Sequence, residues 1–415
     1  MTAALAEHFF RHEYGRLVAT LSRRVGVHHI EAIEDAVQAS LMAALETWTR
    51  GGTPDDPTAW LLRVAHNELL GGIRKDARRR RILQAKDVDG DVLSSEAPLL
   101  AGELQDDLLR MMFVCCDEAI PIDSQLVLVL KTLCGFDVRE IALRLFTTEA
   151  NVYKRLSRAR QRLAEGGPDQ LLDDLDDDQI ASRLSSVQAV IHLVFTEGYL
   201  SSRASMSIRK DLGDEALRLA PVLADHPIGH TPPTLALVAL MHLHAARLDA
   251  RQDEAGGLLL LEEQDRTRWD AERIEEGLRW LAASASGDVM SRYHAEAGIA
   301  AEHCMAPTFE QTRWDRVIAC YDLLERAAPS SLHRLNRAVA VAESAGPEAA
   351  LAALQGASPP TWLAGSYQWA AVLSDLHRRC GDLAEATRHR EVALELAPTE
   401  AVRELLKRRL GGRPT

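Results

Sequence analysis

A group of cations between Glu149 and Arg162 is the strongest chemical signal in this sequence. Lysine and arginine side chains neutralise the phosphates of nucleic acids, and arginine can also bond to the edge of a guanine. The chain as a whole has a formal net charge of -13, so this local excess of positive charge indicates an anionic partner. The cations of this segment are Lys154, Arg155, Arg158, Arg160 and Arg162.

Two short helices joined by a tight turn are predicted to hold these cations. Asp137 and Glu140 have the spacing of a capping box, so a helix is expected to begin there. Thr147–Thr148 interrupts the apolar pattern and can cap a second helix, whose inner stripe includes Val152 and Leu156. The pattern is typical of a helix-turn-helix, whose second helix enters the major groove of DNA. A solvated basic helix in an ordinary bundle remains the alternative for this segment alone.

A second basic element lies upstream, between Pro57 and Ile82. It starts with an apolar helical stripe that includes Trp60 and Leu61, and it ends in a run of arginines. Before it, residues 33–48 are predicted to form an amphipathic helix that begins in acidic residues and ends in a tryptophan. Two basic elements in this order are more specific than either one alone.

Together these elements resemble the sigma-70 family, and in particular its short extracytoplasmic-function group with only regions 2 and 4. The region 2 pattern D-x-V-Q-x-x-x-x-x-A-x-x-x-W matches residues 35–48, and A-W-L-x-x-x-A-x-N matches residues 59–67. The region 4 ending V-x-x-R-L-S-R-A-R matches residues 152–160. Two departures stand out. Gly71 and Gly72 are expected to weaken or kink the region 2 helix, and Phe146 replaces the glycine common in the region 4 turn.

The resemblance implies roles for particular residues. The clamp of the largest subunit of core RNA polymerase would be bound by Asp35, Gln38, Leu41 and Trp48. The promoter −10 element would be bound by Trp60, Asn67, Arg74, Lys75 and Arg78. The promoter −35 element would be bound by Thr148, Glu149, Asn151, Val152, Lys154, Arg155 and Arg158. The polymerase flap is a further expected contact, and no cofactor is implied.

The chain is predicted to be all-α, with region 2 in residues 1–82, an acidic linker in 83–105, region 4 in 106–166 and a helical domain in 168–415. Residues 367–399 have the spacing of a tetratricopeptide unit, and such units stack into an α-solenoid. The whole chain thus resembles extracytoplasmic-function sigma factors with a fused C-terminal tetratricopeptide domain. That resemblance implies regulation by the fused domain. An intramolecular contact of this domain with the sigma regions is a hypothesis motivated by the acidic run at residues 173–178 and by the large C-terminal extension.

Several other classes of protein are disfavoured. No apolar run approaches 20 residues and the first residues do not form a signal peptide, so a cytoplasmic protein without membrane contact is expected. The six cysteines lack C-x-x-C spacing, and His242 and His244 point apart on a helix, so no metal site is predicted. No nucleophile with its base and no phosphate-binding loop is present, so the protein is predicted not to be an enzyme.

Two other functional classes remain open. One is a helix-turn-helix regulator with a solenoid sensor, which would bind promoter DNA without acting through polymerase. The other is a protein-interaction scaffold whose basic segments are incidental. Association with core polymerase is required only by the sigma-factor interpretation, so it discriminates among the three.

Overall fold

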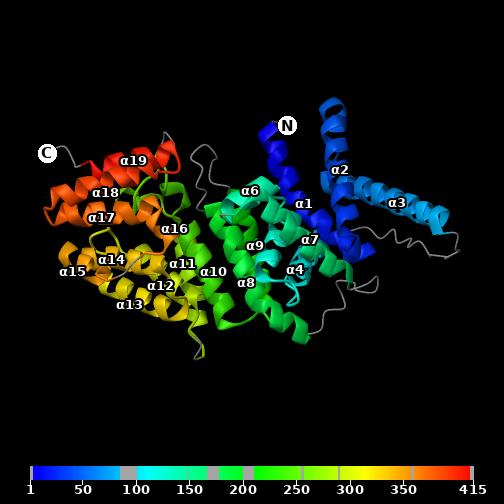
Figure 1. The fold of residues 1–415 in the computed structure, drawn as a ribbon. Helices are drawn as coiled ribbons and strands as arrows, with labels where there is room; N and C mark the ends of the chain where they lie inside the picture. Colours follow the sequence, from blue (N-terminus) through cyan, green and yellow to red (C-terminus); the bar gives the residue numbers. More distant parts are fainter. Residues whose placement is uncertain are drawn as a thin grey trace. The chain divides into compact units, whose positions relative to one another are not determined.

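In the computed structural model, helices connected mostly by short turns account for most of the described residues (Figure 1). The structure describes residues 3–84, 101–145, 147–165, 177–199, 210–253, 257–287, 290–356 and 359–411. Within these ranges the all-α prediction is confirmed, with a single β-bridge between Gln252 and Leu258. None of the helices in these ranges combines the length and apolarity needed to span a bilayer.

The chain divides into two compact units, Met1–Val194 and Phe195–Thr415. The division falls inside one helix, α8 (Asp177–Tyr199). The first part of α8 belongs to unit 1, where the buried Arg183 donates to the Phe113 carbonyl at 3.1 Å and to Asp117 Oδ2 at 2.6 Å. Unit 1 therefore extends beyond the glycines at 166–167 where the sequence suggested a boundary.

Unit 1 begins with a bundle of three helices, α1 (Ala3–Val25), α2 (Ile30–Gly51) and α3 (Pro57–Gln84), with the short 3-10 turn η1 (Val27–His29) after α1. Gly26 and Gly52 end α1 and α2 with positive φ angles of 89° and 82°. Asp56 starts α3 by accepting the Ala59 N–H at 2.9 Å. Helix α3 is continuous through Gly71 and Gly72, and a side chain at either would meet open space.

A second bundle follows, built from α4 (Ala101–Cys115), α5 (Ile122–Thr132), α6 (Val138–Arg144) and α7 (Glu149–Glu165). The predicted capping box is confirmed, since Asp137 accepts the Glu140 N–H at 2.6 Å and Glu140 accepts the Asp137 N–H at 2.9 Å. Phe136, just before α6, is fully buried among these helices. The turn residue Phe146 lies outside the described residues.

Unit 2 continues with helices that pair in succession along the chain (Figure 1). They are α9 (Lys210–Asp225), α10 (Pro232–Ala245), α11 (Ala271–Ser284), α12 (Arg292–Met305), α13 (Trp314–Ala327), α14 (Ser331–Ala345), α15 (Pro347–Leu354), α16 (Thr361–Ala364), α17 (Tyr367–Arg379), α18 (Leu383–Glu395) and α19 (Glu400–Leu410). Each long helix packs on its neighbours, as in a solenoid. The last helix packs on both α17 and α18.

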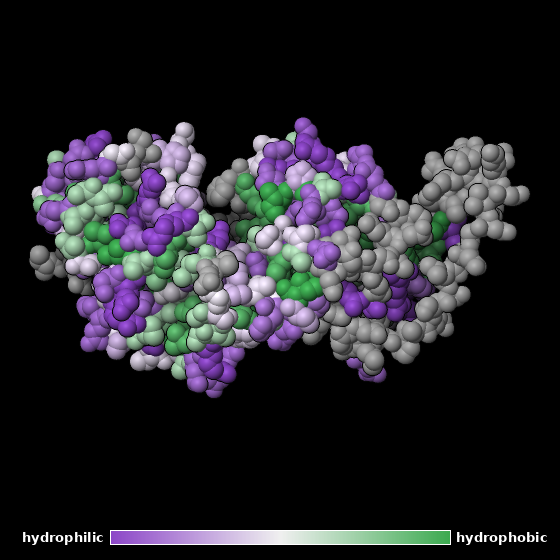
Figure 2. All heavy atoms as spheres, turned by 90° about the horizontal axis from the view of Figure 1, so that it is seen from below, coloured by the Kyte–Doolittle hydropathy of each residue, from purple (hydrophilic) through white to green (hydrophobic). Residues whose placement is uncertain are grey.

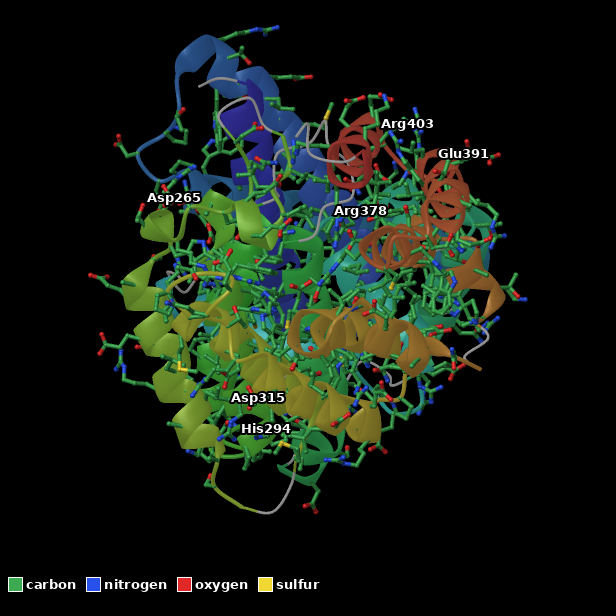
Figure 3. The ribbon with its side chains drawn as sticks, turned by 90° about the vertical axis from the view of Figure 1, so that its left-hand side faces the viewer. Asp265, His294, Asp315, Arg378, Glu391 and Arg403 are labelled. Atoms are coloured by element: carbon green, nitrogen blue, oxygen red, sulfur yellow. The ribbon has the colours of Figure 1, made fainter. Side chains whose placement is uncertain are left out.

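Short polar side chains set where the elements of unit 2 begin. His294 accepts the Ser291 N–H at 3.1 Å at the start of α12, and Asp265 accepts the Thr267 N–H at 2.9 Å in the turn η5 (Arg266–Arg268) (Figure 3). Small residues then allow close helix packing, with Ala370 and Ala371 of α17 in one core cluster with Ala393 of α18. In Figure 2 hydrophilic side chains surround smaller hydrophobic patches, because the apolar helix faces are turned inward.

Candidate nucleic-acid interface

One face of α7 is buried and the opposite face is open to solvent. The buried stripe is Val152, Leu156, Ala159 and Leu163, as the spacing predicted with one further turn. At the start of the helix, Thr148 accepts the Asn151 N–H at 3.3 Å, and Asn151 donates from its side chain to Thr147 Oγ1 at 2.9 Å. The exposed residues of this segment include Thr148, Glu149, Asn151, Lys154 and Arg158. This outer face combines groups that can meet base edges with groups that can meet phosphate.

The seven residues predicted for the −35 element are not equivalent in the structure. Val152 has no exposed surface, so its side chain anchors α7 from inside and cannot meet DNA. Arg155 is largely covered and donates to Asp123 Oδ2 of α5 at 3.0 Å. Lys154 and Arg158 are exposed one helical turn apart, and within the described residues neither has an ion-pair partner. These two cations are the ones immediately available to an anion.

Helix α3 presents a second polar face. Asn67, Arg74 and Lys75 are exposed, and Asn67 and Arg74 share one side of the helix because they lie two turns apart. Arg63, which was not among the residues predicted from the sequence, is exposed one turn before Asn67 on the same side. The side chain of Arg78 lies outside the described residues. The helical period alone could have identified Arg63.

Trp48 and Trp60 have a structural role that their spacing did not reveal. Their rings meet edge to face, with centroids 5.5 Å apart and an interplanar angle of 62°. Trp48 is only 8% exposed, and Trp60 is half-buried. The pair thus fastens α2 to α3, and Trp48 offers little surface to a partner.

The exposed side of α2 instead carries a stripe of polar and apolar residues. Asp35 and Gln38 are exposed as a docking surface requires, whereas Leu41 is half-buried. Met42 and Leu45 continue the stripe at helical spacing and are 60% and 46% exposed. Neither was singled out from the sequence, although the spacing 35, 38, 42, 45 would have placed all four on one face.

Comparisons with known proteins agree with the division of unit 1 into two bundles. Residues 10–79 match the family model "Sigma-70 region 2", and residues 110–163 match "Sigma-70, region 4". The RNA polymerase sigma factor NccH of Alcaligenes xylosoxydans xylosoxydans is 25% identical over 150 residues, which cover 36% of this chain and 80% of that protein. The chain belongs to the sigma-70 family.

Two further matches of this sigma-70 family protein extend beyond the sigma regions. Residues 183–285 match a family of unknown function (DUF6596), so the tetratricopeptide assignment stays a prediction. An uncharacterised protein of Rhizobium meliloti (strain 1021) is 34% identical over 374 residues, which cover 89% of this chain and 87% of that relative. The similarity to this relative therefore extends well beyond the two segments that match the sigma-70 models.

Regions 2 and 4 of the sigma-70 family protein pack against each other within unit 1. Helix α1 lies along α4, and η1 contacts α7. Gly15 of α1 approaches the Leu133 carbonyl so closely that a Cβ atom would collide with it. Arg23 donates to the buried Asp107 at 3.1 Å, while burial raises the pKa of the Asp107 carboxyl. The two regions therefore form one folded body in this structure.

A buried carboxylate at the centre of this contact holds one of the predicted phosphate-binding arginines. Glu34 of α2 is 4% exposed, accepts Thr132 Oγ1–H at 2.7 Å and ion-pairs with Arg160 of α7. Arg160 also reaches Glu31, with 3.4 Å between the charged atoms. Arg160 therefore faces region 2 and is not available to DNA while the two regions are packed together.

Proposed function

We propose that the protein is a transcription initiation factor that binds core RNA polymerase and directs it to promoters with −35 and −10 elements. The observation that carries this proposal is the division of α7 into a buried stripe and an exposed face with Lys154 and Arg158. The match to both sigma-70 regions supports it. The function is a binding function, and we propose no catalytic role.

In this proposal the −35 element is bound by the outer face of α7. Glu149 can accept from the amino group of a cytosine, and Asn151 can pair with an adenine, each worth about 1–3 kcal/mol of discrimination. Lys154 and Arg158 would neutralise phosphates beside them. Arg155 can reach a guanine only if it leaves its ion pair with Asp123. That ion pair is weak, because the Asp123 side chain is exposed.

The −10 element would be bound along α3. Asn67 can bond to an exposed base, with Arg63 and Arg74 on the same side of the helix for the phosphates. Lys75 and Arg78 would extend this basic surface toward the end of the helix. Gly71 lies between Asn67 and Arg74 on this face and has open space around it, so the DNA backbone could approach closely there.

Core polymerase would dock on the exposed stripe of α2. Asp35 and Gln38 supply polar contacts, and Met42 and Leu45 supply exposed apolar surface of the kind that marks protein interfaces. The clamp of the largest subunit is the proposed partner of this stripe, and the flap is the proposed partner of region 4. Trp48 would act through α3, which it positions by its contact with Trp60.

Both promoter elements cannot be bound while regions 2 and 4 are packed together. Elements named −35 and −10 are about 25 base pairs apart, or roughly 85 Å along B-form DNA. A folded unit of about 194 residues has a radius of gyration of only about 16 Å. We therefore propose that the regions separate when polymerase binds, and that Arg160 then exchanges Glu34 for a phosphate.

Binding to purified core RNA polymerase tests this function through the α2 stripe. The double variant Met42→Ala with Leu45→Ala should bind core at least about tenfold more weakly, because it removes exposed apolar contact without disturbing a buried side chain. Ile122→Ala is the matched control, since Ile122 is 47% exposed but lies on α5. Equal binding by wild type and the double variant would refute the docking surface.

We further propose that the C-terminal helices inhibit the sigma regions until a signal releases them. The truncation that tests this should end after Tyr199, because an end after Gly167 would remove the buried Arg183 and leave Asp117 unpaired. Inhibition predicts stronger core binding by residues 1–199 than by the full chain. Unchanged binding would refute it, and loss of transcription would show that the C-terminal helices assist initiation.

A further inference from the structure

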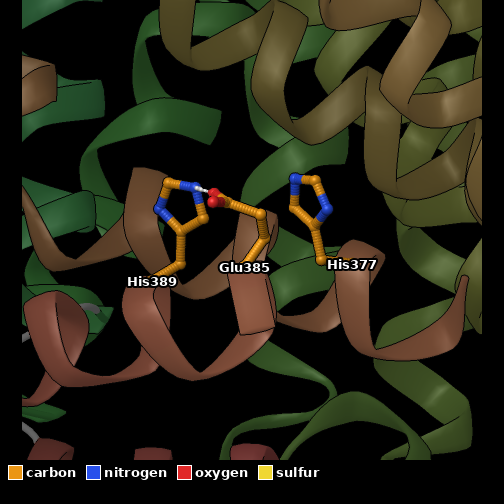
Figure 4. Close-up of side chains that lie close together, drawn as sticks. All are labelled: His377, Glu385 and His389. Atoms are coloured by element: carbon orange, nitrogen blue, oxygen red, sulfur yellow. Dashed lines mark ion pairs between the residues drawn. The ribbon is translucent and has the colours of Figure 1, made fainter. Parts of the chain in front are cut away.

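Three potential metal ligands meet beside the turn that joins α17 to α18 (Figure 4). His377 lies in the last turn of α17, and Glu385 and His389 lie one turn apart on α18, so that they share a face. One donor atom from each residue lies within 4.8 Å of the other two. The two imidazoles are stacked, with centroids 5.7 Å apart and an interplanar angle of 17°.

This set of donors has the chemistry of a transition-metal site. Two imidazoles and a carboxylate are found at zinc sites with three protein ligands and one open position, and the same types of ligand suit other divalent metals of the first transition row. Metal–nitrogen distances of about 2.0–2.1 Å place two ligand atoms of a tetrahedral site about 3.4 Å apart. The donors can reach that separation by rotation of side chains, since all three residues are half-buried and none is locked in a core.

The surroundings leave these donors able to bind a cation. Arg388 donates to Glu385 Oε2 at 2.6 and 3.0 Å, and its Nη2 atom lies 3.4 Å from His389 Nε2, so this guanidinium must move aside when a metal binds. That ion pair is exposed and weak.

A second carboxylate stands next to the cluster. Asp382 Oδ2 lies 3.4 Å from His377 Nδ1, and Asp382 also accepts the Glu385 N–H at 3.2 Å to start α18. A carboxylate beside a metal-binding imidazole fixes the orientation of the ring and raises its basicity. The turn thus holds His377 and the beginning of α18 through one side chain.

We propose that His377, Glu385 and His389 bind one divalent transition-metal ion, with Zn²⁺ as the best match to the donors. The ion would link α17 to α18 through ligands on both helices. These residues lie outside the segments that match the sigma-70 regions and the family of unknown function, so the site is an addition to the proposed promoter-binding function. It makes the stability of this helix pair dependent on metal.

Titration of untagged, metal-free, full-length protein with Co²⁺ tests the site, because Co²⁺ bound to such ligands absorbs visible light. One equivalent should bind with a saturating signal, and Zn²⁺ should displace it. His389→Ala and Glu385→Gln should each weaken binding at least about tenfold. Glu391→Gln is the matched control, because Glu391 is an exposed acid on the same helix (Figure 3) and should leave binding unchanged.

The proposal fails if wild type gives no saturable Co²⁺ signal, or if the ligand variants and Glu391→Gln bind alike. Circular dichroism of each variant without metal shows whether the helices remain folded. Glu385→Gln preserves the shape of the side chain at a partly exposed position, so it keeps the test decisive even if a histidine variant misfolds. A Zn²⁺-dependent rise in Tm should occur in wild type and in Glu391→Gln, and it should be lost in Glu385→Gln.

Discussion

Unit 1 and unit 2 bury charged side chains differently: unit 1 buries carboxylates as well as Arg183, whereas the described part of unit 2 buries only an arginine. In the described part of unit 1, the carboxylates of Glu13, Glu34 and Asp107 are buried, and each has an arginine partner. The described part of unit 2 buries the guanidinium of Arg247 and no carboxylate. Arg247 instead meets the Tyr199 hydroxyl at 3.5 Å and His244 Nδ1 at 3.1 Å.

From this difference we expect the contact between regions 2 and 4 to open more easily than the core around Arg247. Two of the acid–arginine pairs in unit 1 join region 2 to region 4, and their arginines keep partial contact with water. Such pairs gain little net energy when they form, because desolvation offsets much of the attraction. Arg247 in unit 2 is enclosed by rings, with the Trp269 centroid 5.7 Å from its guanidinium carbon.

The largest effect is expected from Trp269→Ala in unit 2. Trp269 is 7% exposed. Besides its contact with Arg247, its ring centroid lies 4.5 Å from the guanidinium carbon of Arg266. Its removal should lower the free energy of unfolding of unit 2 by about 3–5 kcal/mol, through lost burial and two lost cation–π contacts. This change in the free energy of unfolding can be measured by urea denaturation monitored with circular dichroism.

Trp362→Ala is the control for this change, because Trp362 is 60% exposed and should cost no more than about 0.5 kcal/mol. If the two tryptophan variants unfold at the same urea concentration, the enclosed-arginine core does not stabilise unit 2.

The next largest effect concerns the pH dependence of the free energy of unfolding, which should differ between the two units. Burial, with Arg247 and Arg266 nearby, lowers the pKa of His303 to about 3. The unfolded chain then binds a proton below about pH 6.5 that folded unit 2 does not, so acidification should destabilise unit 2 by up to about 1.4 kcal/mol per pH unit between pH 6.5 and 4. His303→Gln should flatten this slope in denaturation curves.

Asp107 in unit 1 should act in the opposite direction. Because burial raises the pKa of its carboxyl, folded unit 1 retains a proton that the unfolded chain has lost, and acidification through that pKa favours folding. Asp107→Asn should remove this contribution. If both units showed the same pH dependence of unfolding, and neither variant changed it, the predicted opposite effects of His303 and Asp107 would be contradicted.

A smaller effect is expected from Glu34→Gln at the contact between regions 2 and 4. The change keeps an acceptor for Thr132 but removes the charge that faces Arg160, and should cost about 1–2 kcal/mol of unit 1 stability. Glu31→Gln is the control, because Glu31 is exposed and its pair with Arg160 is weak. Hydrogen exchange at α7 should rise in Glu34→Gln alone, and equal exchange in both variants would contradict a closed contact centred on Glu34.

The smallest effect is expected on DNA binding, when two arginines of α7 are replaced one at a time. Arg158→Ala should weaken binding to −35 DNA for all sequences alike and reduce the dependence of log affinity on log salt by about 0.9. Arg160→Ala should leave binding to isolated −35 DNA unchanged, because Arg160 is held by Glu34. A larger salt effect from Arg160→Ala than from Arg158→Ala would mean that the regions are already apart in solution.

Local features of the sequence predicted local structure well. The capping box at Asp137 and the inner stripe of α7 depend on residues within one or two helical turns, and both are confirmed. Membership of the sigma-70 family was likewise predicted from short motifs in a fixed order. Helix α3 is continuous through Gly71 and Gly72, because the helix-propensity cost of two glycines is modest; the weakening expected there stays a prediction.

Contacts between distant segments could not be predicted in this way. Arg160 and Glu34 are 126 positions apart, and Arg183 and Asp117 are 66 apart, so nothing local pairs them. The same holds for His377 and His389, which meet only because α17 and α18 fold back on each other. Met42 and Leu45 were different, since helical spacing alone would have placed them beside Asp35.

Transcription in vitro with purified core RNA polymerase, on a supercoiled library of promoters from the source genome, tests the central claim most directly. The proposed function predicts transcripts that depend on this protein and share −35 and −10 elements, with loss of promoter selectivity when Glu149 and Asn151 are replaced by alanine. Tight, salt-sensitive binding to promoter duplexes without any dependent transcript would contradict it and would favour a helix-turn-helix regulator that acts without polymerase.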